Sequence, residues 1–312
     1  MAGISTSWED KHDYDWRDDS KVTKKTAREY AKEDKREYSG MSSKGIPSPV
    51  GKELSSDSPL VLALVVDVTG SMKKWPGLIF NKIPTLYNES NAALQCVDLA
   101  DLKKGKSIED ILDMSVIAIG DAYVDSHPLQ VVEYSKGPNL VNGVNKILPE
   151  GGGGPFGRES YELAAYFLAK HSTTPKVPST AKPILIYAAD EDFYDTIKTN
   201  QVKQHIGDIL TESLSSDKII QELAKKFDMY VLRPEPEGSN DVYDRAQRHW
   251  ESLLGSQRVL KMQNPERLVD CIIGICAYTA DNLDQGVKIL ERRQTSEQVR
   301  QVLETLHPLS GK

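Results

Sequence analysis

Residues 60–72 read LVLALVVDVTGSM and decide the fold of this 312-residue chain. The first seven are apolar without polar alternation, which is typical of a central strand covered on both faces. The strand then presents Asp67, Thr69 and Ser71 at its carboxyl end, the edge at which open α/β sheets bind ligands. One carboxylate and two hydroxyls suit a hard cation that prefers oxygen ligands, so we expect a metal site here. The alternative is a structural turn in which Ser71 caps the next helix.

The composition limits the class of protein and of partner. Hydrophobic residues make up 39% of the chain and charged residues 27%, which is enough for a substantial core. A formal net charge of −7 argues against nucleic acid and anionic membranes as general partners. Three cysteines are too few for a disulfide framework, and Cys271 and Cys276 lie in an apolar run, as small core residues do.

The N-terminal part differs from the rest of the chain. It carries charges within the first dozen residues and has no secretory signal, and no apolar run in the chain is long enough to span a bilayer. These features favour a cytoplasmic protein. Residues 1–57 combine an acidic opening, a stretch of mixed charge and a proline-containing linker at 45–51, and we expect a solvated, partly helical arm.

Strands and helices are expected to alternate from residue 58 onward. Strands are predicted at residues 60–66, 114–120, 129–134, 184–189, 229–233 and 258–262. Helices are predicted at residues 75–102 (bent or opened at Pro84), 139–148, 160–171, 208–227, 242–254, 265–278 and 284–306. This order indicates a doubly wound α/β fold with a mostly parallel sheet sandwiched by helices. We divide the chain into the arm and linker (1–57), one α/β domain (58–280) and a C-terminal amphipathic helix (281–312).

The motif Asp67-Val68-Thr69-Gly70-Ser71-Met72 resembles the first motif of the metal-ion-dependent adhesion site (MIDAS) of von Willebrand factor A (vWA) domains. That motif reads Asp-x-Thr-x-Ser or Asp-x-Ser-x-Ser before a large apolar residue. The resemblance covers roughly residues 58–280 and implies the Rossmann-like vWA fold. It also implies a third site loop whose aspartate directly follows a buried strand, a position that Asp190 matches. The alternative for Asp190 is a helix cap.

The second site loop departs from the common family pattern. Many members place a threonine there, whereas residues 150–160 read EGGGGPFGRES. This loop is similar to that of a subgroup with Gly-Gly-Gly-Asp-x-x-Glu before an alanine-rich helix, as in the vWA domains of alpha-kinases. Glu159 and Ser160 are therefore further candidates for the metal site, while Gly154 stands where the subgroup has its aspartate. Glycines allow backbone to pass close to a metal or a partner.

The resemblance implies a function in binding rather than catalysis. Thr69 and Ser71 would bind Mg²⁺ (or Mn²⁺ or Ca²⁺) directly, with Asp67 and Asp190 holding it through water or at longer range. An open coordination position would take a carboxylate from a protein partner. Intracellular bacterial and phage members of the family further imply an adaptor for a ring-shaped AAA+ ATPase of the MoxR type.

Three other readings are weighed against this one. The chain could be a structural or scaffold protein that keeps the vWA fold with an inactive metal site. Residues 120–125, GDAYVD, fit a metal-binding motif of haloacid-dehalogenase-like phosphatases, but Thr69 replaces the usual acid/base aspartate and the two motifs are too close in sequence. The glycine-rich loop lacks the Lys-Ser/Thr of a nucleotide-binding loop. The six histidines do not cluster in sequence, so surface or capping roles are expected for them.

Overall fold

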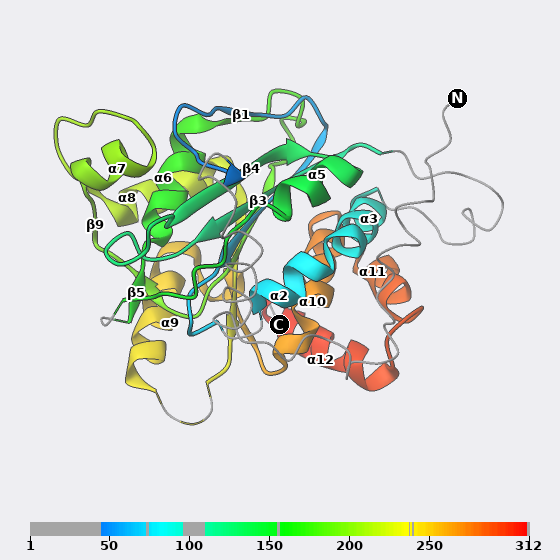
Figure 1. Cartoon of the computed structure of the whole chain (residues 1–312). Coiled ribbons are helices and arrows are strands. Elements are labelled where there is room, and N and C mark those ends of the chain that lie inside the picture. Colours follow the sequence, from blue (N-terminus) through cyan, green and yellow to red (C-terminus); the bar gives the residue numbers. More distant parts are fainter. Residues whose placement is uncertain are drawn as a thin grey trace.

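The computed structural model describes residues 45–72, 75–95, 110–154, 157–236, 238 and 240–310. Among these residues, six strands form a central sheet in the order β12-β11-β7-β2-β3-β4 (Figure 1). The strands are β2 (Leu60–Asp67), β3 (Leu112–Ile119), β4 (Leu129–Ser135), β7 (Ile184–Ala188), β11 (Asp228–Pro234) and β12 (Val259–Met262). All neighbours are parallel except β3 and the edge strand β4. The predicted mostly parallel α/β sheet is confirmed.

The strand order places a topological switch point beside β2. From β2 the chain proceeds to β3 and β4 on one side, then returns to β7, β11 and β12 on the other. Asp67 of β2 is in register with Ile119 of β3, and Val66 with Ala188 of β7, so these three strands end at one edge. Ligands of open α/β sheets bind at the carboxyl ends of strands at such a point. Asp67 and Asp190 therefore flank the position where this fold favours a ligand.

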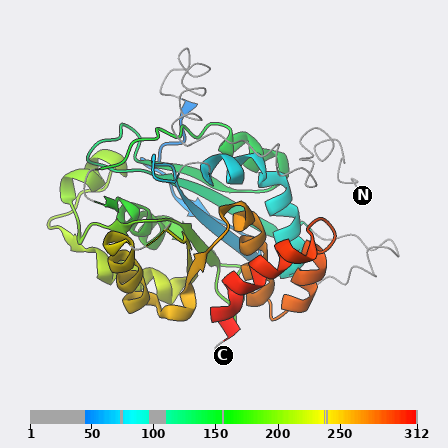
Figure 2. The same cartoon turned by 90° about the horizontal axis from the view of Figure 1, so that it is seen from below.

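Helices cover both faces of the sheet, as Figures 1 and 2 show. One layer contains α2 (Trp75–Asn81), α3 (Ile83–Leu94), α5 (Gly137–Val144), α10 (Leu268–Thr279), α11 (Leu283–Leu290) and α12 (Ser296–Leu306). The other contains α6 (Tyr161–His171), α7 (Thr199–His205), α8 (Ser216–Lys226) and α9 (Asp241–Leu254). Alternate residues of β2 face the two cores, Leu62 and Leu64 one layer, Ala63 and Val65 the other. This explains why the strand is apolar at every position.

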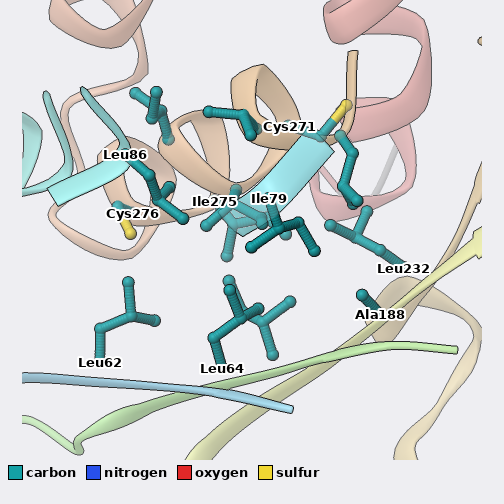
Figure 3. Packing of buried hydrophobic residues seen from close by; sticks show 14 of the residues in the cluster. Leu62, Leu64, Ile79, Leu86, Ala188, Leu232, Cys271, Ile275 and Cys276 are labelled. Atoms are coloured by element: carbon teal, nitrogen blue, oxygen red, sulfur yellow. The ribbon is translucent and has the colours of Figure 1, made fainter. Parts of the chain in front are cut away.

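The core above β2 is built around α10. Figure 3 shows Ile275 and Cys276 of this helix on the side of Leu62 and Leu64 of the strand, whereas Cys271 lies farther from the strand, beside Thr305 of α12. Both cysteines are free and fully buried, which confirms their prediction as core residues. The third cysteine, Cys96, lies outside the described residues.

Short elements complete the fold around this core. Two-residue strands pair as β1 (Leu54–Ser55) with β6 (Ser172–Thr173), β5 (Arg158–Glu159) with β8 (Asp192–Phe193), and β9 (Thr196–Ile197) with β10 (Leu214–Ser215). Short 3₁₀ turns are η4 (Ser256–Arg258), η5 (Pro265–Arg267) and η6 (His307–Ser310). None of the helices within the described ranges is long and apolar enough to cross a membrane.

The segment that precedes β2 contacts the domain. The Pro47 carbonyl accepts a hydrogen bond from Val131 N at 2.7 Å, on the outer edge of the sheet. Leu54 is only 1% exposed and belongs to one of the two cores. These contacts lie ahead of the predicted boundary at residue 58, so the stretch from 47 to 55 packs with the domain. The predicted arm at residues 1–44 lies outside the described residues.

The predicted single helix at residues 284–306 is wrong. The structure has α11 and α12 instead, and α12 begins at a capping box formed by Thr295 and Gln298. Between the helices, the Arg293 side chain points inward and binds Glu89 and Asp270, so the break places an arginine in a buried ion-pair network. No apolar residue lies between Leu290 and Val299, and the prediction extended one helix across this polar stretch.

Other helix boundaries also differ from expectation. The first predicted helix is opened, as expected, into α2 and α3, with Pro84 in the first turn of α3. The predicted helix at 208–227 begins only at Ser216, because Asp208 binds His171 and Tyr166 and because residues 214–215 form β10. Helix α7 was not predicted from sequence.

Candidate metal centre

The first site loop, residues 67–72, forms a compact cluster of oxygens. Asp67 is fully buried, and its Oδ1 accepts hydrogen bonds from Thr69 N at 2.7 Å and from Thr69 Oγ1 at 2.6 Å. Thr69 Oγ1 lies 3.0 Å from Ser71 Oγ, and Ser71 is exposed. The structure therefore brings the three predicted residues of this loop together. Because the Thr69 hydroxyl donates its proton to Asp67, its lone pairs remain for another group.

The other oxygen of Asp67 is held by a residue that the sequence analysis missed. Tyr161, the first residue of α6, donates its hydroxyl proton to Asp67 Oδ2. Burial, and next the charge of Asp190, raise the pKa of Asp67 well above its usual range. Both oxygens of Asp67 are thus used by the protein. The carboxylate orients the Thr69 hydroxyl, in keeping with a role at longer range from a metal.

The second site loop, residues 150–154 and 157–160, passes close to carboxylates, and its glycines make this possible. A Cβ on Gly152 would lie 1.8 Å from Asp125 Oδ1, and one on Gly154 would lie 2.1 Å from Asp121 Oδ2. Gly153 has a φ of +119°, where a side chain would be strained. Gly152 also accepts a hydrogen bond from the backbone of the first loop, Gly70 N, at 2.8 Å. The two loops are therefore joined through backbone.

The two aspartates of residues 120–125 organise this turn. Asp125 Oδ2 accepts a hydrogen bond from Asp121 N at 2.8 Å, and Asp121 accepts from Tyr123 N and from the Tyr194 hydroxyl, each at 3.0 Å. Ser160 joins the same network, since its hydroxyl accepts from Ala122 N at 2.9 Å and donates to Asp121 Oδ1 at 3.4 Å. Its hydrogen bonds thus connect Ser160 to the loop after β3.

Glu159 lies deeper in the site. It is 1% exposed, its Oε1 lies 3.0 Å from the Cβ position of Gly153, and that position is 3.4 Å from Thr69 Cβ. Its Oε2 is buried, with no hydrogen-bond partner in the part of the chain that the structure describes. Burial, and then the negative charges of Asp67 and Glu191, raise the pKa of Glu159 to about 11.

Glu191 is a second site residue that the sequence analysis missed, although it directly follows Asp190. Its Oε2 is also buried without a hydrogen-bond partner. Burial and the charge of Asp190 raise the pKa of Glu191 to about 7, against the opposing effect of Arg233. Arg233 Nη2 donates to the Asp190 carbonyl and so supports this third loop, residues 189–191. Buried carboxylates that repel one another gain stability from a bound cation.

A pocket of about 500 Å³ adjoins the site. Ser71 and Asp190 line one part of it, and Trp75, Pro236 and Tyr243 are among its other walls. The pocket lies where β2, β7 and β11 end, beside the first turn of α9. It offers room for a group of side-chain size next to the oxygen cluster.

The donor set fits a hard cation held through hydroxyls and water. Within the ranges that the structure describes, no three His, Cys, Asp or Glu side chains are arranged so as to hold a metal ion by themselves. A site at this edge would therefore draw its direct ligands from Thr69 and Ser71 as well. Oxygen donors without sulfur or imidazole suit Mg²⁺, Mn²⁺ or Ca²⁺.

Comparison with known proteins gives a distant likeness of fold only. No family model and no curated protein matches the chain. It is similar to the pilus adhesin SpaC of Lactobacillus rhamnosus GG in its open conformation, at 11% identity and a TM-score of 0.46, over 78% of this chain and 31% of the adhesin. It is also similar to proximal thread matrix protein 1 of the mussel byssus, at 9% identity and a TM-score of 0.39, over 72% of this chain and 49% of that protein. The chain thus spans less than half of either protein, and these likenesses assign no function.

Proposed function

We propose that this chain is a vWA-type domain that binds one divalent cation, Mg²⁺ or a relative such as Mn²⁺ or Ca²⁺, and uses it to bind a carboxylate of a protein partner. One observation carries the proposal. Glu159 and Glu191 each bury a carboxylate oxygen that has no hydrogen-bond partner among the described residues, beside the Asp67–Ser71 motif. Carboxylates buried in this way need either protons or a cation.

The residues of the site have separate roles in this proposal. Thr69 and Ser71 offer hydroxyl oxygens 3.0 Å apart as direct ligands. Asp67 keeps the Thr69 proton directed away from the cation, and Asp190 adds negative charge from the neighbouring strand. When bound, the cation supplies an electrophilic centre at which a partner's carboxylate can replace a water molecule.

The same charges make binding dependent on the metal. Without the cation, an approaching carboxylate meets the acidic side chains of Asp190 and Glu191, whose negative charge repels it at close range. The adjoining pocket, with Trp75 and Tyr243 in its walls, then accommodates a neighbouring side chain of the partner. A ring-shaped AAA+ ATPase of the MoxR type, which the family resemblance implies, is the partner class to test first.

A domain without catalysis of its own is the reading that we favour. The carboxylates of Asp121 and Asp125 are engaged by backbone amides and by the Tyr194 hydroxyl, which supports a structural role for residues 120–125. This observation disfavours the phosphatase alternative.

Thermal unfolding tests the metal half of the proposal. The wild type in millimolar Mg²⁺ or Mn²⁺ is expected to melt at a higher temperature than in EDTA. A ligand that binds only the folded state raises the free energy of unfolding by about 2.7 kcal/mol when its concentration is a hundred times Kd. Ser71→Ala removes an exposed hydroxyl and should abolish most of this shift without changing the melting temperature in EDTA. Ser213→Ala, at an exposed serine ahead of β10, is the matched control and should behave as the wild type. No shift in the wild type would favour a scaffold with an inactive site.

An array of peptides with a fixed central residue tests the partner half. Peptides with aspartate or glutamate should bind in Mg²⁺ and not in EDTA, and those with asparagine or glutamine should not bind in either. Equal binding of both sets would contradict carboxylate recognition.

A further inference from the structure

His249 connects three elements close to the candidate metal centre. It lies on α9, its Nδ1 is 2.7 Å from Asp192 Oδ1, and its Nε2 is 3.1 Å from Asp217 Oδ1 at the start of α8. Its ring lies 4.5 Å from the ring of Phe193. Sequence analysis expected only surface or capping roles for the histidines, because these partners are far away in the chain.

Asp192 and Phe193 form β8, and this strand bears directly on the site. β8 pairs with β5 so that Phe193 is in register with Glu159, the buried glutamate of the second loop. The residues just before β8 are Asp190 and Glu191 of the third loop. His249 therefore holds the strand that follows the third loop and that pairs with the last residues of the second loop.

The neighbouring residue of α9 supports the same loop. Trp250 Nε1 donates a hydrogen bond to the Glu191 carbonyl at 3.2 Å. Trp250 is fully buried, and its ring lies 4.8 Å from that of Phe193. His249 and Trp250, which are consecutive on α9, thus hold β8 and the backbone of the third loop, respectively.

We propose that His249 is a positioning residue of the metal centre, which holds β8 so that Glu159, Asp190 and Glu191 keep the spacing that the cation requires. The inference rests on the proposed function. Residues that orient metal ligands from behind commonly change metal affinity by tenfold to a hundredfold when they are replaced.

The charges around His249 give the role a pH dependence. The groups that face it are Asp192 of β8 and Asp217 of α8. The hydrogen bond to Asp192 raises the pKa of His249 above its ordinary value, against the opposing effect of burial. The charged form of His249, hydrogen-bonded to both aspartates, is therefore present at low pH and is lost as pH rises through the raised pKa. Competition between protons and the metal for the carboxylates weakens metal binding at low pH. Loss of the charged form of His249 has the opposite pH dependence and should weaken metal binding at high pH.

The chain contains a matched control in His171. Its ring nitrogens also contact two carboxylates, Glu53 and Asp208, each at 2.7 Å, and its ring stacks on Phe167. Burial lowers the pKa of His171, but those two hydrogen bonds raise it overall. His171 ends α6, and Glu53, Asp208 and Phe167 all lie outside the three site loops. Replacing it removes the same chemistry at a different place.

The test compares His249→Gln with His171→Gln by measuring Mn²⁺ affinity and the melting temperature in EDTA between pH 6 and 9. Both variants should melt at a lower temperature, because each loses a charged bridge. Only His249→Gln should bind Mn²⁺ about tenfold more weakly at neutral pH and lose the decline at high pH. Unchanged Mn²⁺ affinity in His249→Gln, or an equal loss of Mn²⁺ affinity in His171→Gln, would overturn this inference but not the proposed function. Absence of Mn²⁺ binding by the wild type would overturn the proposed function as well.

Asp217→Asn gives a milder second variant. It alters a half-exposed partner of His249 and leaves the Asp192 contact in place. It should lower the pKa of His249 and move the decline in Mn²⁺ affinity to lower pH. A decline at an unchanged pH would count against the positioning role.

Discussion

The Tyr161 hydroxyl donates a hydrogen bond to Asp67 Oδ2 across 94 residues of sequence. Tyr161 begins α6 directly after the second site loop, whereas Asp67 ends the central strand β2. The bond therefore joins two of the three loops at the carboxylate whose other oxygen, Oδ1, orients the Thr69 hydroxyl. The second loop has no threonine between Gly151 and Ser160, and the hydroxyl that reaches the first loop comes from this tyrosine instead.

Tyr161→Phe should weaken metal binding and destabilise the protein. The change leaves a buried carboxylate oxygen without its donor, and loss of a hydrogen bond to a charged group costs about 1.5–3 kcal/mol. Tyr187→Phe is the control, because the Tyr187 hydroxyl is buried in the same aromatic cluster without a hydrogen-bond partner. Urea unfolding and Mn²⁺ titration should separate the two variants. A Tyr161→Phe protein that matches Tyr187→Phe in both would contradict the role of this bond.

Gly152→Ala should disturb the second loop. The added methyl group would lie 1.8 Å from Asp125 Oδ1, and Asp125 is held in place by its bond to Asp121 N. We expect a lower melting temperature and weaker Mn²⁺ binding, since the Gly70–Gly152 backbone bond must lengthen. An unchanged melting temperature and unchanged Mn²⁺ binding would contradict this prediction and show that the loop can move away from Asp125 without loss of stability or affinity.

Glu159→Gln should change how the stability of the metal-free protein depends on pH. With a pKa raised to about 11, Glu159 keeps its proton in the native state, while the unfolded chain releases it near the ordinary pKa of 4.5. Stability is therefore greatest below about pH 4.5 and falls as pH rises toward 11, by at most about 1.4 kcal/mol per pH unit from this group. Urea unfolding in EDTA at pH 5.5 and 8 should show a smaller fall for Glu159→Gln than for the wild type. The exposed Glu212→Gln should keep the wild-type fall.

Arg293→Met should destabilise the C-terminal helices. Arg293 Nε lies 2.9 Å from Glu89 and its Nη1 lies 2.6 Å from Asp270, both partly or fully buried. Removing one partner of a buried ion pair costs roughly 3–5 kcal/mol. Arg300→Met removes an exposed arginine that pairs within α12, and should change stability little. Equal effects in chemical unfolding would contradict a special contribution from the buried network.

Local sequence patterns predicted the elements of the sheet well. The apolar run ahead of Asp67 indicated a strand covered on both faces, and the six expected strands form one sheet. The spacing of apolar residues was less reliable in the helices. The break before α12 had a local signal in the capping box of Thr295 and Gln298, whereas the burial of Arg293 against Glu89 and Asp270 depends on residues far away in the chain.

The residues themselves predicted the candidate site best where one loop contains several of its members, whereas Asp190, Glu159 and Ser160 were predicted from the family resemblance. Asp67, Thr69 and Ser71 share a short motif, and the structure joins them by hydrogen bonds. Tyr161 and Glu191 carry no local signal, since their roles arise from packing between α6, β2 and β7. For the same reason, the likeness of residues 120–125 to a phosphatase motif could not be judged before their hydrogen bonds were known.

Electron paramagnetic resonance of Mn²⁺ tests the central claim most directly. Free Mn²⁺ gives a six-line signal that is lost on binding, so a titration reports the number and affinity of sites. We predict one Mn²⁺ per wild-type chain, displaced by Mg²⁺, with binding strongly weakened in Thr69→Val and Ser71→Ala and retained in Ser213→Ala. A signal that stays at full strength with the wild type, or that is lost equally with all of these variants, would contradict a metal centre at this edge of the sheet.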